Sequence, residues 1–292
     1  MTLKQDTYPQ ALKDIIPTGV EYIPRDLGDG STDLEVLEYA LKTHQNVLIV
    51  GPTGVAKTRL VRKHCEALGL AFVNIPGYEA IDMDQLLGQP VQKPDGTIGW
   101  RYGALPLAAA HGKACIYLDE VNGIKQGNTM MFHGMMDDRR EVTLMQHGEQ
   151  FDGPLTVKLA DDAQVVATMN IGYKGTRALN EAFAGRFDIV IDFDYDPNVD
   201  QYLVGSKSLQ KLAGELRAAF KAGELVTPTP TKRMERFEQH VVDVGYTFAV
   251  TTFVNAYHPD ERAGVRSRFE AAEDRLLSDY GLAWVDADVE GN

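Results

Sequence analysis

Cysteine is scarce in this sequence, with only Cys65 and Cys115 among 292 residues. Two cysteines cannot build the disulfide framework of a small secreted domain, and they show no metal-ligand spacing. Cys65 falls in a predicted helix and Cys115 at the start of an apolar run. We therefore expect two buried thiols in a reducing compartment.

Long hydrophobic runs and positive charge are also lacking. No run is long enough to span a bilayer, and the N-terminus, MTLKQDTYPQ, has no apolar signal core, so we expect a cytoplasmic protein. The chain has 29 Lys and Arg against 42 Asp and Glu, a net charge of -13. This acidity disfavours a protein that tracks along nucleic-acid backbones, although a basic pore lining could be hidden in the average.

Short apolar runs alternate with helical periodicity as far as residue 193. Helices are predicted over residues 32–43, 57–68, 81–87, 105–111, 126–138 and 179–184. Strands are predicted over residues 47–50, 71–75, 115–118, 164–169 and 188–193. Hairpins are predicted at about 88–104 and about 141–160, the second with Gly148 near its turn. This alternation predicts an α/β fold with a parallel five-stranded sheet.

The pattern changes after residue 196, because residues 198–283 show helical periodicity and almost no strand signal. We predict an N-terminal arm over residues 1–30, an α/β nucleotide-binding core over 31–196 and a helical domain over 197–292. The chain length agrees with about two domains.

The strand at 47–50 runs into the segment GPTGVAKT, and a helix follows. In this context a Gly-rich segment predicts a phosphate-binding loop, in which backbone N–H groups and a helix N-terminus face phosphates. Lys57 would reach the β- and γ-phosphates, and the Thr58 hydroxyl would bind Mg²⁺. A strand-to-helix turn without a ligand is the alternative. The candidate nucleotide-binding residues are Gly51, Pro52, Thr53, Gly54, Val55, Ala56, Lys57, Thr58 and Arg59.

Ala56 stands where the generic loop pattern has its second glycine. Alanine is acceptable there if the residue already has a helical φ, because alanine at a helix start costs little. Whether alanine fits therefore depends on the backbone conformation at Ala56.

Two carboxylates follow the buried strand at 115–118. Asp119 and Glu120 would lie at the carboxyl edge of the sheet, where ligands bind in open α/β folds. Asp119 can join a Mg²⁺ shell, usually through water, and Glu120 can accept a proton from an attacking water. The alternative, a helix cap beside a solvated Glu, is disfavoured by the phosphate loop on another strand of the sheet.

Three further residues have two interpretations each. Asn170 ends the strand at 164–169 and could orient the attacking water, but Asn after a strand also commonly starts a turn. Arg186 could reach a neighbouring subunit's γ-phosphate or form a surface ion pair. Arg233 lies in the first turn of a helix for which Thr231, after Pro230, is the expected N-cap, and a cation there points to an anionic partner.

Taken in order, the motifs GPTGVAKT, CIYLDE, VVATMN, LNEAFAGRF and TPTKR resemble those of MoxR-type AAA+ ATPases in the dynein-related branch. The likeness covers about residues 20–275 and is greatest for the CbbQ/NorQ group, with some for the small ATPase subunit of cobaltochelatase. The resemblance implies an AAA+ P-loop NTPase core with a small C-terminal all-helical lid domain. It also implies ATP and Mg²⁺ as cofactors, and the family's loop often carries Ala before its Lys.

The resemblance also implies roles for the polar residues. Asn170 corresponds to the first sensor, Arg186 to the arginine finger, and Arg233 to the second sensor, with Lys232 an adjacent alternative. Arg139 or Arg140 corresponds to an additional arginine acting in trans.

The resemblance further assigns two segments. Residues 84–112 resemble the family's inserted hairpin, which faces the central opening of a ring, and Gly103, Ala104 and Leu105 stand where the family has a GPL-like turn. Gly172, Gly175 and Arg177 would lie near the subunit interface.

By resemblance, the chain forms an ATP-hydrolysing ring, usually a hexamer, with the nucleotide between the two domains. Such rings act as chaperone-like remodellers of a protein partner, often one with a von Willebrand A domain. We expect no membrane partner. A nucleic-acid-associated or restriction-type NTPase motor, which could use GTP, is the alternative. Lys93 and Arg101 against Asp95 give it little support. A non-enzymatic nucleotide-gated scaffold would need a broken catalytic set, whereas Asp119, Glu120 and Asn170 are all present.

Overall fold

The computed structural model describes residues 15–78, 82–147, 153–171 and 178–282. The chain divides into two compact units. The first comprises residues 1–51 and 56–193, and the second comprises residues 52–55 and 194–292.

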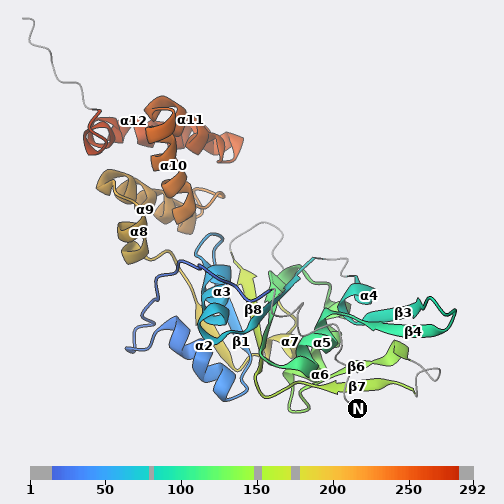
Figure 1. Ribbon diagram of the computed structural model, residues 1–292. Helices are drawn as coiled ribbons and strands as arrows, with labels where there is room; N and C mark the ends of the chain where they lie inside the picture. The colour runs from blue at the N-terminus through green and yellow to red at the C-terminus, as the bar shows by residue number, and fades with distance from the viewer. Residues whose placement is uncertain (1–14, 79–81, 148–152, 172–177, 283–292) are drawn as a thin grey trace, which may run out of the picture. The chain divides into compact units, whose positions relative to one another are not determined.

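The first unit is built on a five-stranded parallel sheet with the order β2-β5-β8-β1-β9 (Figure 1). The strands are β1 (Val47–Gly51), β2 (Ala71–Pro76), β5 (Ala114–Asp119), β8 (Ala163–Asn170) and β9 (Ile189–Asp192). The central strands are buried on both faces, as continuous apolar runs predict. The expected five-stranded parallel sheet is confirmed.

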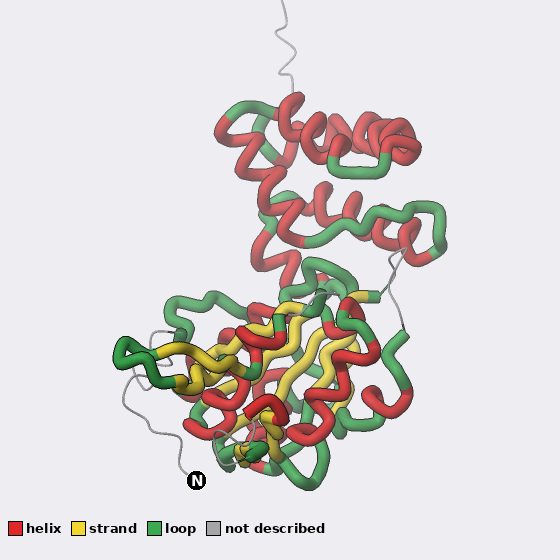
Figure 2. The backbone as a smooth tube through the Cα atoms, turned by 90° about the vertical axis from the view of Figure 1, so that its right-hand side faces the viewer, coloured by secondary structure: helices red, strands yellow, loops and turns green. Residues whose placement is uncertain are grey.

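Helices lie on either side of these strands (Figure 2). They are α2 (Asp33–Lys42), α3 (Lys57–Leu68), α4 (Met83–Leu86), α5 (Ala104–His111), α6 (Gln126–Met136) and α7 (Glu181–Ala184). Leu48 and Val50 of β1 belong to one buried cluster with Leu105 of α5 and Phe132 of α6. Because side chains alternate along a strand, Ile49 faces the opposite side of the sheet.

Local signals explain two of the helix ends. The Thr32 hydroxyl accepts from the Glu35 backbone N–H, and the Glu35 carboxylate accepts from the Thr32 N–H, which fixes the start of α2. Gly69 ends α3 in the left-handed conformation, with φ 64°, where glycine has no steric penalty. Helix α3 therefore covers the predicted residues 57–68.

Two antiparallel hairpins extend side by side from the first unit (Figure 1). They are β3 (Gly88–Gln92) with β4 (Ile98–Tyr102) and β6 (Glu141–Leu144) with β7 (Leu155–Lys158). The Trp100 and His147 rings connect them, with centroids 5.3 Å apart. Both predicted hairpins are present, while Gly148 lies outside the described residues. Short 3₁₀ helices cover Val121–Gly123, Met145–His147 and Pro259–Glu261.

Between residues 197 and 282 the second unit is built from helices and loops, as the predicted fold class requires. Its helices are α8 (Pro197–Leu203), α9 (Lys207–Lys221), α10 (Thr231–Asp243), α11 (Tyr246–Asn255) and α12 (Arg262–Asp279). Three aromatic rings join the last three of these helices, because Phe237 lies 5.8 Å from Phe253 and 5.5 Å from Phe269 between ring centroids. No described helix is both long and apolar enough to cross a membrane.

A buried polar network ties α8 and α9 to the start of α10. The Arg217 guanidinium pairs with the Asp200 carboxylate, and its Nε donates to the Thr229 carbonyl oxygen at 2.9 Å. The Thr231 hydroxyl also donates to Asp200, at 2.7 Å. The expected N-cap role of Thr231 is therefore wrong: Thr231 is the first helical residue after Pro230, and its hydroxyl serves a tertiary contact.

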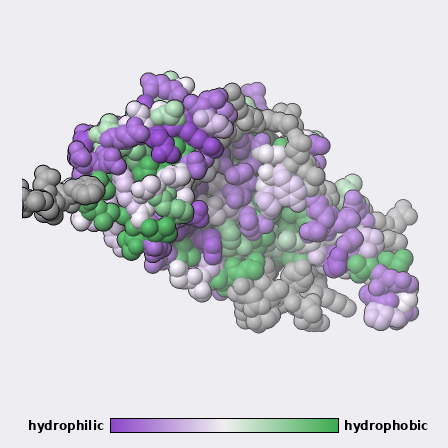
Figure 3. Space-filling model, turned by 90° about the horizontal axis from the view of Figure 1, so that it is seen from above, coloured by the Kyte–Doolittle hydropathy of each residue, from purple (hydrophilic) through white to green (hydrophobic). Residues whose placement is uncertain are grey.

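Both cysteines are fully buried free thiols, so the expected burial is confirmed. Cys65 lies on α3 and Cys115 on β5. The hydrogen bond with Cys65, together with burial, raises the pKa of the Cys115 thiol. Outside the core, Figure 3 shows hydrophilic residues over much of the visible face, with smaller hydrophobic patches between them.

Candidate nucleotide-binding site

The predicted phosphate loop joins the end of β1 to the start of α3. Gly51 has no room for a side chain, because an added Cβ atom would lie 2.4 Å from the Phe193 carbonyl oxygen. Gly54 has φ +80°, a conformation that other residues rarely adopt. Both glycines are therefore required by the backbone path. Among the other loop residues, Pro52 and Val55 are buried, while Thr53 and Arg59 are exposed.

The condition under which alanine is accepted at this position, a helical φ at Ala56, is not met. Its φ of 67° and ψ of 25° are left-handed, and its carbonyl oxygen accepts the first helical hydrogen bond from Leu60 at 3.0 Å. A left-handed L-residue costs about 1–2 kcal/mol. The generic loop therefore prefers glycine at this position because the backbone is left-handed there. Ala56 adopts this conformation with the smallest side chain after glycine.

Three residues from distant motifs form one hydrogen-bonded chain. The Lys57 amine donates to the Gly51 carbonyl oxygen and to Asn170 Oδ1, each at 2.7 Å. Asn170 Nδ2 in turn donates to Glu120 Oε1 at 2.6 Å. The strand order places β8 between β1 and β5, so the carboxyl ends of these strands bring the three motifs together.

The electrostatic setting of Lys57 is unusual for a lysine. Its side chain is buried, with 7% of the residue surface exposed. Burial lowers the pKa of Lys57 from 10.5 to about 8, while Asp119 and Glu120 oppose this change by favouring the charged amine. An anionic ligand at this loop would add to the effect of the two carboxylates.

The two predicted metal ligands meet through a tyrosine. Thr58 Oγ1 lies 3.0 Å from the Tyr117 hydroxyl oxygen, and the Tyr117 hydroxyl donates to Asp119 Oδ1 at 2.9 Å. The Thr168 hydroxyl donates to the same carboxylate oxygen at 2.7 Å. Hydroxyl and carboxylate oxygens are the hard ligands that suit Mg²⁺. Thr58 and Asp119 therefore have the right chemistry for this ion.

Within the described ranges, no cluster of three or more His, Cys, Asp or Glu side chains could hold a metal. An all-protein cage is not what Mg²⁺ needs, because it is commonly bound by one or two carboxylates together with substrate phosphates and water. A threonine and an aspartate beside a phosphate loop match that pattern.

Sequence reasoning missed Tyr117 and Thr168. A signal was available, because Tyr117 and Asp119 are two residues apart on β5, and Thr168 and Asn170 are two apart on β8. Residues at that spacing share a face of a strand. The parallel register pairs Leu118 with Ala167, so the residues that follow them, Asp119 and Thr168, are neighbours across the two strands.

Arg186 follows α7, and the backbone around it is well anchored. The Asn46 side-chain amide donates to the Arg186 carbonyl oxygen and to that of Met136, both at 2.8 Å. Arg186 Nη1 donates to the Ala182 carbonyl oxygen. In the part of the chain that the structure describes, Arg186 forms no ion pair, and its Nε is buried without a hydrogen-bond partner.

The adjacent arginines after α6 differ in their surroundings. Arg139 is exposed and pairs with Asp137 at 2.7 Å. Arg140 is half-buried, and its guanidinium donates to the backbone carbonyls of Ala163 at 3.1 Å and Ala160 at 3.3 Å. Arg140 therefore secures the start of β8, whereas Arg139 has a side chain at the surface. Gly172, Gly175 and Arg177 lie outside the described residues.

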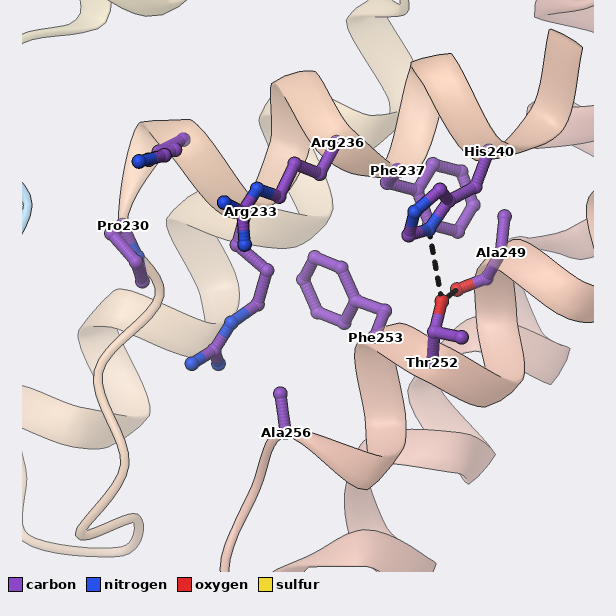
Figure 4. A pocket seen from close by; sticks show the side chains of 10 residues that line it. Pro230, Arg233, Arg236, Phe237, His240, Ala249, Thr252, Phe253 and Ala256 are labelled. Carbon is purple, nitrogen blue, oxygen red and sulfur yellow. Dashed lines mark hydrogen bonds between the residues drawn. The ribbon is translucent and has the colours of Figure 1, made fainter. Parts of the chain in front are cut away.

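Arg233 lies in the helical unit, on the first turn of α10 (Figure 4). Its guanidinium carbon lies 4.8 Å from the centre of the Tyr257 ring and 5.8 Å from that of Phe253. It lines a pocket of about 300 Å³ together with other basic residues and apolar side chains of α10 and α11. The basic residues of this pocket are Lys232, Arg233, Arg236 and His240.

A family model for AAA domains of the dynein-related subfamily matches residues 46–187, which include Lys57, Asp119, Glu120, Asn170 and Arg186. The chain is also 30% identical over 207 residues to the protein NorQ of Paracoccus denitrificans, and the match covers 67% of this chain and 72% of NorQ. The chain belongs to the MoxR-type AAA+ ATPases of the dynein-related subfamily.

Two other proteins are similar in sequence to this MoxR-type ATPase. The denitrification regulatory protein NirQ of Pseudomonas aeruginosa is 34% identical over 164 residues, which cover 56% of this chain and 60% of NirQ. The protein CbbQ of Hydrogenophilus thermoluteolus is 32% identical over 178 residues, covering 60% of this chain and 63% of CbbQ. The matches therefore span less than two thirds of the length of NirQ and CbbQ.

Proposed function

We propose that this chain binds ATP with Mg²⁺ at residues 51–58 and hydrolyses it. The observation that carries the proposal is the hydrogen-bonded chain from Lys57 through Asn170 to Glu120. It joins a phosphate-binding cation, a water-orienting amide and a carboxylate base at one edge of the sheet. Membership of a family of ATPases supports the same activity.

Each residue has one step in the proposed reaction. Lys57 binds the β- and γ-phosphates, and Thr58 and Asp119 would hold Mg²⁺, which when bound neutralises phosphate charge. Asn170 orients the water, and Glu120 accepts its proton as the water oxygen attacks the γ-phosphorus in line with the departing ADP. The charge that develops on the transferred phosphoryl group is stabilised by Lys57 and by an arginine.

That arginine is Arg186 of a neighbouring subunit in a homo-oligomeric ring, which we place as a hexamer by analogy with the family. Two observations support this role: Asn46 anchors the Arg186 backbone, and no carboxylate among the described residues forms an ion pair with its guanidinium, so its charge is left for a ligand of another subunit. Arg233 of the helical unit is the proposed second sensor, which couples the state of the nucleotide to motion of that unit.

The pKa of Lys57 provides a prediction for nucleotide binding. Bound phosphates should raise this pKa above its ligand-free value of about 8, so binding at alkaline pH requires uptake of a proton. We expect the affinity for ATP to fall about tenfold between pH 7 and pH 9. Calorimetry in buffers of different ionisation enthalpy would measure the affinity and the proton uptake together.

The control is Lys57→Arg, whose guanidinium stays charged over this pH range. Its affinity for ATP should be lower overall but nearly independent of pH. A wild-type affinity that stays constant from pH 7 to pH 9 would contradict the assignment.

The stability of the protein without nucleotide should depend on pH in the opposite direction. The unfolded chain holds the Lys57 proton more tightly than the folded chain does, so the free energy of unfolding should rise from about pH 8 to pH 10.5.

We propose further that hydrolysis drives chaperone-like remodelling or activation of a protein partner, and that this partner carries a von Willebrand A domain. The net charge of -13 favours a protein partner over nucleic acid. A pocket of about 410 Å³ beside the two hairpins supports this, because methionine side chains adapt to varied apolar partners. Its apolar lining includes Leu87, Trp100, Met130, Met131, Leu144 and Met145.

The proposed function is tested by measuring the ATPase rate against protein concentration, with mass from light scattering with and without ATP and Mg²⁺. Because Arg186 acts in trans, the rate per subunit should rise as the ring assembles. A constant rate per subunit from a stable monomer would overturn the ring and the role of Arg186. Stimulation by DNA, rather than by a von Willebrand A protein, would overturn the choice of partner.

A further inference from the structure

We propose that Tyr117 is a positioning residue for the Mg²⁺ site: its hydroxyl accepts a hydrogen bond from the Thr58 hydroxyl and holds the Asp119 carboxylate in place. This inference rests on the proposed binding of ATP with Mg²⁺. Tyr117 is fully buried in the central strand β5, and its ring packs on Phe72 with centroids 5.1 Å apart. The phenol is therefore fixed in position before any ligand arrives.

The direction of each hydrogen bond follows from the number of protons. Tyr117 has one hydroxyl proton, and it is donated to Asp119 Oδ1 at 2.9 Å. Thr168 also has one, and it is donated to the same oxygen at 2.7 Å. The Tyr117 and Thr168 hydroxyl oxygens also lie 3.0 Å apart, but both of their protons are already placed on Asp119 Oδ1. We therefore assign the proton in the 3.0 Å contact between Thr58 Oγ1 and the Tyr117 oxygen to Thr58.

This direction matters for a metal site. A hydroxyl binds a cation through an oxygen lone pair, so its proton must point elsewhere. When Thr58 donates to Tyr117, its lone pairs are directed away from the phenol and are available to the ion. Tyr117 thus selects the orientation in which Thr58 can be a ligand.

The same hydroxyl orients the carboxylate. Asp119 Oδ1 accepts from both Tyr117 and Thr168, while neither residue donates to Oδ2. Two donors on one oxygen fix the rotation of the carboxylate and leave the other oxygen for the metal shell. Partners of this kind typically contribute about tenfold or more to metal affinity.

Thr168 extends the arrangement to the catalytic base. Its hydroxyl oxygen also accepts from the Glu120 backbone N–H at 3.2 Å, and Glu120 has a left-handed backbone with φ 49°. Thr168 therefore contacts the residues assigned to the metal and to the base, whereas Tyr117 contacts both proposed metal ligands. Substitutions at the two positions should have different consequences.

The test is Tyr117→Phe, which removes one oxygen and keeps the ring. A fluorescent ADP analogue would be titrated with saturating Mg²⁺ and with EDTA, and Mn²⁺ binding to the ADP complex would be followed by electron paramagnetic resonance. We expect Mn²⁺ affinity to fall about tenfold while ADP affinity in EDTA is unchanged. Thr168→Val, which leaves the bond between Thr58 and Tyr117 in place, should lower Mn²⁺ affinity less.

The control is Tyr280→Phe, which also removes a hydrogen bond from a tyrosine to a carboxylate, that of Glu238, in the helical unit. It should bind Mn²⁺ like the wild type. Unchanged Mn²⁺ affinity in Tyr117→Phe would overturn the proposal, as would equal losses of ADP affinity with Mg²⁺ and with EDTA. If Tyr117→Phe fails to fold, the test passes to Thr168→Val. Wild-type Mn²⁺ affinity in that variant would overturn the claim that the two hydroxyl donors orient the Asp119 carboxylate for the metal. A wild-type protein that binds no ADP analogue at all would instead overturn the proposed function.

Discussion

Glu120→Gln is expected to bind ATP almost as tightly as the wild type and to hydrolyse it at least about a hundredfold more slowly. Glutamine keeps the shape of the side chain and an oxygen that can still accept from Asn170 Nδ2, as Glu120 Oε1 does at 2.6 Å. It cannot take a proton from water. Binding and hydrolysis should therefore separate in this variant.

The measurement is single-turnover hydrolysis beside equilibrium ATP binding. Glu38→Gln is the matched control, because Glu38 is an exposed carboxylate that pairs with Lys42 on α2. It should hydrolyse ATP at the wild-type rate. If Glu120→Gln also hydrolyses ATP at the wild-type rate, Glu120 is not the base. If it loses ATP binding, the residue supports the loop instead.

Arg186→Ala is expected to bind ATP normally and to lose hydrolysis by about a thousandfold or more. An arginine that acts on a neighbouring subunit stabilises charge in the transition state and contributes little to binding of the ground state. Mixing inactive Arg186→Ala and Glu120→Gln subunits should restore part of the activity. Some interfaces in such a ring would combine an intact Glu120 with an intact Arg186.

The control for this experiment is Arg268→Ala, because Arg268 lies on α12 and pairs at the surface with Glu224. It should hydrolyse ATP like the wild type, alone and in mixtures. Activity in Arg186→Ala alone would exclude the role in catalysis. Failure of the two inactive variants to restore activity, although they assemble together, would place both residues on the same subunit's site.

The elements with strong local signals were predictable from the sequence. Helix α3 covers residues 57–68 as expected, because its apolar stripe begins after the loop and Gly69 ends it. The five strands were recognisable as short apolar runs. These features depend on neighbouring residues in the chain, which a sequence displays directly.

The features that were missed depend on tertiary contacts. Tyr117 and Thr168 meet because β5 and β8 are neighbours in the sheet, and an isolated strand pattern does not reveal its neighbour. Thr231 bonds to the buried Asp200 rather than capping its own helix. The left-handed φ of Ala56 follows from the path of the loop, and an alanine, unlike a glycine, gives no signal in the sequence for a positive φ. The roles of the individual site residues stay predictions, those of Lys57, Thr58, Asp119 and Glu120 as well as those of Asn170, Arg186 and Arg233.

The burial of both cysteines has a practical consequence for following assembly. Thiol reagents attack accessible thiolates, and neither native thiol is exposed. A cysteine introduced at an exposed position such as Arg266 should therefore react alone with a maleimide dye, without removal of Cys65 or Cys115. Two dye-labelled preparations could then report subunit exchange by energy transfer, in the otherwise native protein.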